Sequence, residues 1–363
     1  MYEGSGTCGA LLFRRHAGPF GLRPVAGDGA GSGGWGRAPT AMKLDVRRQL
    51  YGCARLLVLV AGVLFHTHSR AADYFVFTSF RGNGEDGLHL AWSTNGYQWE
   101  ALMGDRSFLK PKVGAYKIMR DPCLAEGPDG TFHLVWTSGW TADKGKIIGH
   151  AQSKDLIAWS EQQAIALMDN EPRARNIWAP EIFYDKARRR WLLFWSSTIP
   201  GRFPETDDTG DDGYNHRFYY TTTADFQAFG ESRLLYDPGF NAIDATLFKA
   251  RGKFYLFFKD ERKQPLMKNL RYAAADRPEG PFNEPSAPFT RDWVEGPSVI
   301  RIKREYLVYF DHYAEPHYYG AVRSKDLRHW EDCSRLMSFP KGHRHGTVLK
   351  VRSQVARRLL ALQ

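Results

Sequence analysis

Hydrophobic residues along this chain gather in short runs separated by polar turn segments. Five runs are especially rich in aromatic residues: 75–80, 132–137, 191–196, 254–258 and 306–310. Runs of this length and composition are typical of buried strands, because aromatic and β-branched side chains pack well on a pleated surface. No long amphipathic helical pattern lies between them. The sequence therefore predicts an all-β protein.

A second pattern repeats with these runs. Each is followed by a small or polar residue, then an Asp or Asn two positions on, then an aromatic residue. The Asp or Asn positions are Asn95, Asp155, Asp225, Asp276 and Asp326. Five copies of a β-unit at such spacing predict a five-bladed β-propeller with four-stranded blades. A serial pair of β-sandwiches is the structural alternative.

The two ends of the repeat region predict how the ring closes. The first aromatic run has no earlier strand that could lie inside it, whereas residues 345–351 have the apolar character of an inner strand. They would complete the blade begun by residues 74–102. We therefore expect the last blade to be closed by strands from both termini, which removes open sheet edges.

About ten residues before each aromatic run stands a polar residue that would begin the innermost strand. These residues are Asp121, Glu181, Asp244, Glu295 and, in the terminal blade, His345. Equivalent positions in a closed ring face one another, so we expect them to cluster. Clustered carboxylates raise each other's pKa and cost stability, which favours a catalytic use such as glycoside hydrolysis. The alternative is that each acid serves its own blade, and Glu181 suits that interpretation best.

Charge and cysteine content exclude other classes of protein. The net charge is +10, but residues 1–72 carry nine Lys and Arg against three Asp and Glu, and the remainder carries 41 against 37. The body of the chain therefore shows no basic patch for nucleic acid. Two of the four cysteines lie in the N-terminal part, and the remaining two, Cys123 and Cys333, are too few and too far apart for a disulfide framework or a metal-ligand pattern, so we expect no zinc site.

The N-terminal part is predicted to lie outside the fold. Residues 1–41 hold eleven glycines and would be a disordered extension or a stretch upstream of a true start at Met42.

Residues 42–71 have the basic segment, the ten apolar residues (56–65) and the small-residue end of a signal peptide. Ten apolar residues are about half of a bilayer span, so we expect no integral membrane segment. The alternative is a short buried helix. The prediction is a secreted or periplasmic domain at residues 72–363.

Four motifs occur in order along the body of the chain: Arg-Asp-Pro at 120–122, Trp-Ala-Pro-Glu at 178–181, Ile-Asp-Ala-Thr at 243–246 and Glu-Gly-Pro at 295–297. With the five-blade repeat, residues 73–352 resemble glycoside hydrolase family 43, five-bladed propeller enzymes acting on arabinofuranosides, xylosides and galactofuranosides. The resemblance implies a general base at Asp121, a general acid at Glu295, and an auxiliary acid at Asp244 that orients the machinery and modulates the donor.

The same resemblance implies an oligo- or polysaccharide substrate, an inverting mechanism and no required cofactor. Arg120, Trp178, Glu181 and His345 would contact substrate, and His345 corresponds to a channel histidine that in relatives often sits by a water-bound metal, here a structural calcium. Trp178 could instead pack between blades. The acidic loop 198–215 could rim the pocket or be solvated, and calcium capture there fits no standard loop. A non-catalytic carbohydrate-binding propeller and a propeller phosphorylase are the rival functions.

Overall fold

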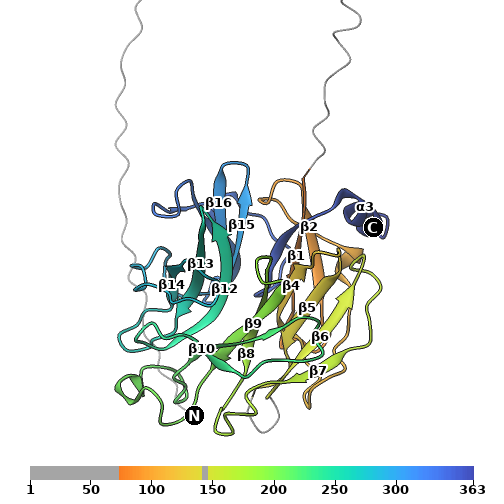
Figure 1. Ribbon diagram of the computed structural model, residues 1–363. Coiled ribbons are helices and arrows are strands. Elements are labelled where there is room, and N and C mark those ends of the chain that lie inside the picture. The colour runs from red at the N-terminus through yellow and green to blue at the C-terminus, as the bar shows by residue number, and fades with distance from the viewer. Residues whose placement is uncertain (1–72, 141–145) are drawn as a thin grey trace, which may run out of the picture. The chain divides into compact units, whose positions relative to one another are not determined.

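The computed structural model describes residues 73–140 and 146–363. The predicted extension (1–41) and signal peptide (42–71) lie outside the described residues. The described chain forms five antiparallel sheets, arranged as the blades of a propeller (Figure 1). This confirms the all-β, five-bladed fold expected from the repeat.

The strands of the first three blades are given from the inside of each blade outward. The first blade consists of β19 (Val348–Val351), β1 (Tyr74–Ser79), β2 (His89–Ser93) and β3 (Glu100–Ala101). The second consists of β4 (Arg120–Glu126), β5 (Phe132–Thr137), β6 (Ile147–Ser153) and β7 (Gln163–Ala166). The third consists of β8 (Trp178–Asp185), β9 (Arg190–Ser197), β10 (Arg217–Thr223) and β11 (Arg233–Tyr236).

The last two blades follow the same inside-out order. The fourth consists of β12 (Ala242–Ala250), β13 (Lys253–Asp260) and β14 (Asn269–Ala275). The fifth consists of β15 (Val294–Ile302), β16 (Glu305–His312), β17 (Tyr318–Ser324) and β18 (Glu331–Asp332). Short 3₁₀ turns η1 (Met103–Asp105), η2 (Pro204–Thr206) and η3 (Ser334–Leu336) lie in the connections.

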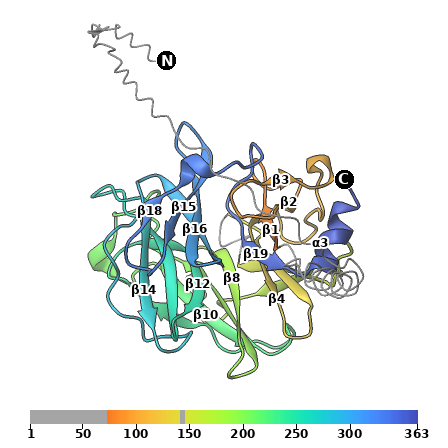
Figure 2. The same cartoon turned by 90° about the horizontal axis from the view of Figure 1, so that it is seen from above.

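The first blade joins strands from opposite ends of the described chain. β19 pairs antiparallel with β1, with Val348 opposite Phe77 and Val351 opposite Tyr74. Figure 2 shows β19 beside β1. The inner strand of this blade therefore comes from the end of the sequence and its three outer strands from the beginning.

The fourth blade differs from the predicted four strands, because no fourth strand forms in the described residues that follow β14. Residues 283–289 still run along β14, and the N–H groups of Asn283, Ser286 and Phe289 donate to Ala274, Tyr272 and Leu270. Pro285 and Pro288 interrupt this segment, and proline has no N–H to donate to a ladder. The segment covers the edge of the blade without forming a regular strand.

The repeated Ser/Thr-x-Asp segments are turns that leave the third strand of a blade. In the second blade, Ser153 Oγ accepts the Leu156 N–H, and Asp155 Oδ1 accepts the N–H groups of Ile157 and Ala158. Asp326 in the fifth blade accepts the equivalent pair from Arg328 and His329. The repeat therefore arises from turns in which a short polar side chain satisfies the backbone.

Apolar side chains fill the space between neighbouring blades. One such cluster also receives Val355, Ala356 and Leu359 from helix α3 (Ser353–Leu360), which lies beside the first two blades in both views (Figures 1 and 2). None of the helices in residues 73–140 and 146–363 has the length and apolarity that a bilayer crossing requires.

Candidate active site

The inner strands of blades two to five carry a β-bulge near their first residue, at the end of the ring that we call the mouth. The four bulges span residues 120–123, 178–181, 243–246 and 295–298. In each, the second residue has a left-handed backbone: Asp121 (φ 51°), Ala179 (φ 46°), Asp244 (φ 57°) and Gly296 (φ 59°). A bulge adds one unpaired residue and redirects the side chains around it.

The bulges show that the four acids are not at equivalent positions, contrary to the sequence alignment. Asp121 and Asp244 are the second residues of their bulges, Glu295 is a first residue, and Glu181 is a fourth. Counting from the aromatic run misses this, because the number of residues from the second bulge position to the start of the aromatic run varies from 10 to 12 among the four blades.

The first blade supplies a matching pair. Phe80 pairs with Arg344 in an isolated bridge, whereas Phe77 pairs with Val348, so the register again shifts between them. Arg344 thereby takes the first position and His345 the second. Three second-position side chains, from the first, second and fourth blades, are therefore polar: His345, Asp121 and Asp244.

These three side chains meet. His345 Nδ1 lies 3.2 Å from Asp121 Oδ1 and 3.8 Å from Asp244 Oδ2. Thr137 Oγ1 donates to Asp121 Oδ2 over 2.8 Å and itself accepts the Ala179 N–H. The predicted juxtaposition of Asp121, Asp244 and His345 is therefore present, and Asp121 is fixed on both carboxylate oxygens.

Gly296 makes this contact possible. A Cβ at this position would collide with the imidazole carbons of His345, and its φ of +59° is one that only glycine adopts without strain. Its N–H donates to Asp244 Oδ2 over 3.2 Å. The glycine of the Glu-Gly-Pro motif thus gives His345 the space to reach across the fifth blade toward Asp244.

The three groups hold different charges at neutral pH. Burial would raise the pKa of Asp121, but His345, Arg120 and Thr137 outweigh it and hold this pKa at about 2. Burial would lower the pKa of His345, but Asp244, Asp121 and Glu295 raise it to about 9. Burial, followed by the nearby Glu295 charge, raises the pKa of Asp244 to about 7 despite His345. At neutral pH the site therefore contains an ionised carboxylate (Asp121), a protonated imidazole (His345) and an acid that titrates near neutrality (Asp244).

Glu295 lies between two cations. Arg344 Nη2 is 3.0 Å from Glu295 Oε1, and Lys259 Nζ is 3.1 Å from Glu295 Oε2. Arg344 also contacts Asp311 over 3.2 Å, and His317 contacts the same Asp311 over 2.6 Å. Lys259 is held in addition by Glu261 at 2.7 Å.

Glu181 lies deeper along its strand and is buried. It accepts a hydrogen bond of 2.9 Å from Thr246, the fourth residue of the bulge in the next blade. Burial raises the pKa of Glu181 to about 7, although Thr246 and His345 oppose the shift. Its hydrogen bond with Thr246 joins it to a neighbouring inner strand, which fits the blade-supporting interpretation better than direct substrate contact.

The other predicted contact residues lie at first positions of the bulges. The Arg120 guanidinium stacks over Phe80 at 4.7 Å and over Trp140 at 4.3 Å. Trp178 is half-buried, with Tyr214 at 4.7 Å and His216 at 5.2 Å between ring centroids. The packing role considered for Trp178 is therefore present, against the β9–β10 loop rather than between inner strands.

The acidic loop 198–215 connects β9 and β10 at the mouth. Tyr214 brings it onto Trp178, and Arg175 stacks over Tyr214 at 4.1 Å. Asp211 pairs with Lys268 at 2.7 Å and Lys263 at 3.0 Å, so this carboxylate is not simply solvated. The loop therefore contacts Trp178 through Tyr214, and its role as a rim of the substrate pocket stays a prediction.

Sequence reasoning missed Lys259, Arg344 and Asp311. The sequence held a signal for Lys259 and Asp311, because each is a charged residue directly after an aromatic run that predicts a buried strand. In the structure both side chains are almost fully buried. Arg344 directly precedes His345. Lys259 lies 36 residues from Glu295 in the sequence, and Arg344 lies 33 residues from Asp311 and 49 from Glu295, so only the fold brings these pairs together.

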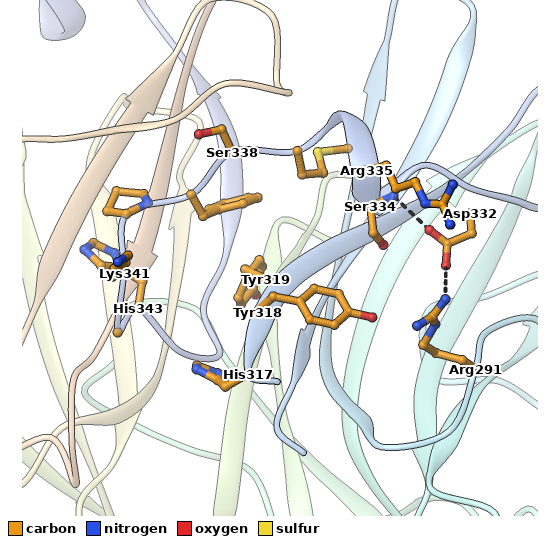
Figure 3. A pocket seen from close by; sticks show the side chains of 14 residues that line it. Arg291, His317, Tyr318, Tyr319, Asp332, Ser334, Arg335, Ser338, Lys341 and His343 are labelled. Atoms are coloured by element: carbon orange, nitrogen blue, oxygen red, sulfur yellow. Dashed lines mark hydrogen bonds and ion pairs between the residues drawn. The ribbon is translucent and has the colours of Figure 1, made fainter. Parts of the chain in front are cut away.

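A cavity of about 930 Å³ lies outward from Arg344, between the fifth blade and the chain that leads into β19. His317, Tyr318, Tyr319, Lys341 and His343 are among its lining residues (Figure 3). His317 connects this cavity to Glu295 through Asp311 and Arg344.

The implied calcium near His345 has limited room for direct ligands. The Asp121 carboxylate is engaged by His345 and Thr137, and one Asp244 oxygen accepts the Gly296 N–H. Calcium takes six to eight oxygen ligands. A metal ion beside His345 would have to be held through water, so calcium there stays a prediction and no step below uses it.

Comparisons with known proteins agree with this arrangement. A family model described as a probable glycosyl hydrolase domain, related to glycoside hydrolase family 43, matches residues 71–356. An α-L-arabinofuranosidase of Bifidobacterium longum subsp. longum is 28% identical over 162 residues, which is 40% of this chain. The match covers 15% of the length of that relative.

Two solved structures are also similar. An α-L-arabinofuranosidase from Lactobacillus brevis has a TM-score of 0.48 at 21% identity, over 60% of this chain and 72% of that chain. An exo-β-1,3-galactanase from Clostridium thermocellum has a TM-score of 0.46 at 13% identity, over 61% and 50%. Because the family match spans nearly all the described residues, the chain belongs to the glycosyl hydrolase family related to family 43.

Proposed function

We propose that this protein is a glycosidase that cleaves furanosidic or xylosidic linkages of plant or microbial polysaccharides by an inverting single displacement. The observation that carries the proposal is the contact of Asp121 and Asp244 with one imidazolium, His345, beside Glu295. Glycoside hydrolysis requires one carboxylate that stays ionised and a second acid that donates a proton, and we assign these roles to Asp121 and Glu295.

Asp121 is the general base in this proposal. Its low pKa, about 2, keeps it ionised throughout the working range, and His345 and Thr137 fix its orientation. A water molecule bound by this carboxylate attacks the anomeric carbon as the bond to the leaving oxygen breaks. Asp121 takes the proton of the water, and the sugar is released with inverted configuration.

Glu295 is the general acid. It donates its proton to the leaving oxygen, and Lys259 and Arg344 then offset the charge that its carboxylate gains. Asp244 is a positioning acid, because its oxygen contacts the backbone of Gly296 and the ring of His345. In this proposal Arg120 and Trp178 contact sugar rings near the mouth of the ring.

The substrate class is proposed from the family and from its similar members. The matching relative from Bifidobacterium longum is an α-L-arabinofuranosidase. We therefore put arabinofuranosides first, followed by xylosides and galactofuranosides. The partner is an oligo- or polysaccharide.

The test is a panel of nitrophenyl glycosides and natural oligosaccharides with the protein beginning near Ala72. Asp121→Ala should lose activity on every substrate, whereas Glu295→Ala should lose about 10²–10⁴-fold on natural linkages and much less on activated nitrophenyl substrates. The reason is that nitrophenolate needs little protonation when it leaves. Glu181→Ala is the matched carboxylate control.

Three outcomes would overturn the assignment. Equal losses on both kinds of substrate in Glu295→Ala would exclude Glu295 as the donor and make Glu181 the next carboxylate to test. Turnover that requires phosphate would indicate a phosphorylase. Sugar binding without any turnover would indicate a carbohydrate-binding propeller.

We also propose that the domain is exported, as a secreted or periplasmic enzyme. The support is the basic, apolar and small-residue order of residues 42–71 and the polysaccharide substrate proposed above. N-terminal sequencing of protein recovered outside the cell should find a start near Ala72. Recovery of an intact chain confined to the cytoplasm would contradict export.

A further inference from the structure

Three potential metal ligands converge in the first blade. His89 lies on β2, Asp105 ends η1, and His343 lies in residues 337–347, which lead into β19 and which we call the closing segment. One ligand atom from each lies within 4.8 Å of the other two. Among residues 73–140 and 146–363, this is the only group of three His, Cys, Asp or Glu side chains that meets this condition.

The distances suit a small tetrahedral cation. Asp105 Oδ1 lies 3.1 Å from His89 Nδ1 and 3.0 Å from His343 Nε2. Ligands bound to zinc at about 2.0–2.1 Å in a tetrahedron are about 3.3 Å apart, so small movements would complete the site. The two imidazole rings are 5.9 Å apart at an angle of 69°, which lets both nitrogens address one point.

The outer nitrogen of each ring has an oxygen partner. His89 Nε2 lies 2.8 Å from Asp86 Oδ2, and His343 Nδ1 lies 2.6 Å from Ser79 Oγ. Histidines that bind metals almost always donate their other N–H to such a group, which fixes the ring and its tautomer. Both imidazoles here have that support.

The surroundings of His89 point the same way. Both of its nitrogens face carboxylates, Asp86 and Asp105, and the side chain is only 2% exposed. A cation between Nδ1 and Asp105 would be bound by both of them and would leave Nε2 to contact Asp86.

The local backbone presents Asp105 to the two rings. Met103, Gly104 and Asp105 are all left-handed, with φ of 54°, 57° and 64°. Such strained backbone persists where the surroundings hold it, and ligand sites are among those places. Arg81 contacts Asp105 Oδ2, which orients the carboxylate and leaves Oδ1 for the site. Asp105 is 22% exposed, so solvent can reach a fourth position.

We propose that His89, Asp105 and His343 bind one zinc-like divalent cation. Two imidazoles and one carboxylate are ligands typical of zinc, with water in the remaining position. The ion would fasten the closing segment to the first blade. His343 directly precedes Arg344 and His345, and it also borders the cavity of Figure 3. The metal therefore secures the part of the chain that brings these two residues to Glu295 and Asp121.

The test uses the chain without a histidine tag, stripped with a chelator and returned to metal-free buffer. After zinc is added back and the excess is removed by gel filtration, the zinc content should be one ion per chain. Zinc should also raise the melting temperature, because a ligand that binds only the folded state stabilises it. Cobalt(II) should give the visible absorption of a tetrahedral site. Neither readout depends on glycosidase activity.

Variants locate the ion. His89→Gln, Asp105→Asn and His343→Gln should each lose the zinc and the cobalt spectrum, whereas His150→Gln, in the stacked buried pair His133 and His150, should keep both. Failure of the stripped wild-type chain to retain zinc would overturn the proposal even if a variant misfolds. Retention of one zinc in all three ligand variants would overturn it as well.

Discussion

Gly296 is the residue at which backbone conformation and chemistry are most tightly joined. We expect Gly296→Ala to cost about 1–3 kcal/mol for the left-handed backbone. It should also abolish most activity, because the new Cβ occupies the place of the His345 ring. Gly252→Ala is the matched control, since its φ is +80° but nothing lies within 4 Å of its Cβ. Denaturant unfolding and kcat/KM measure both effects. Equal activity in the two variants would contradict the role of His345.

The pH dependence of activity follows from Asp244. Burial and then the Glu295 charge raise its pKa to about 7, so Asp244 holds a proton below pH 7 and loses it above. Because an ionised Asp244 competes with the base Asp121 for the His345 imidazolium that orients it, kcat/KM on natural linkages should fall as pH rises through about 7. In Asp244→Asn this limb should move away from pH 7. An unchanged limb would show that Asp244 takes no part in the titration.

At this scale the sequence predicted the residues but not their relations. Asp121, Asp244 and His345 were found from motif and repeat, and the structure brings them together. Their distinction from Glu181 depends on which residue of the bulge each occupies. The hydrogen-bond register of each inner strand decides which position of the bulge a residue occupies, and the spacing of residues along the sequence does not reveal that register.

Helix α3 is the element that the strand pattern did not predict, because eight residues are too few for a clear period. Leu359 of this helix is 1% exposed against the first two blades, whereas Leu362 beyond it is 37% exposed. Leu359→Ala should therefore cost about 2–5 kcal/mol. Leu362→Ala should cost less than about 0.5 kcal/mol. Equal unfolding free energies would mean that α3 does not stabilise the propeller.

The strands themselves were predictable, since aromatic runs of five or six residues correspond to β1, β5, β9, β13 and β16. The outer edge of the fourth blade was not. Prolines there replace regular pairing by isolated hydrogen bonds, and the repeat count does not register that difference.

At the scale of the whole molecule, the ring explains why distant motifs form one site. β19 returns to β1, so Arg344 and His345 lie beside residues that precede them by 49 to more than 220 positions. The number of blades and the inner strands could be read from the repeat. The cation partners of Glu295 and the proposed metal ligand in the closing segment, His343, could not be predicted in this way, because they lie outside the repeated pattern of the sequence.

The anomeric configuration of the first-formed product tests the central claim most directly. Proton NMR of an arabinofuranoside digest, recorded before the released sugar equilibrates, should show the inverted anomer. Asp121 and Glu295 lie on separate blades, and we predict a carboxyl separation in the range of inverting enzymes, roughly 6.5–9.5 Å. Retention of configuration would contradict the single displacement and the roles proposed for both carboxylates.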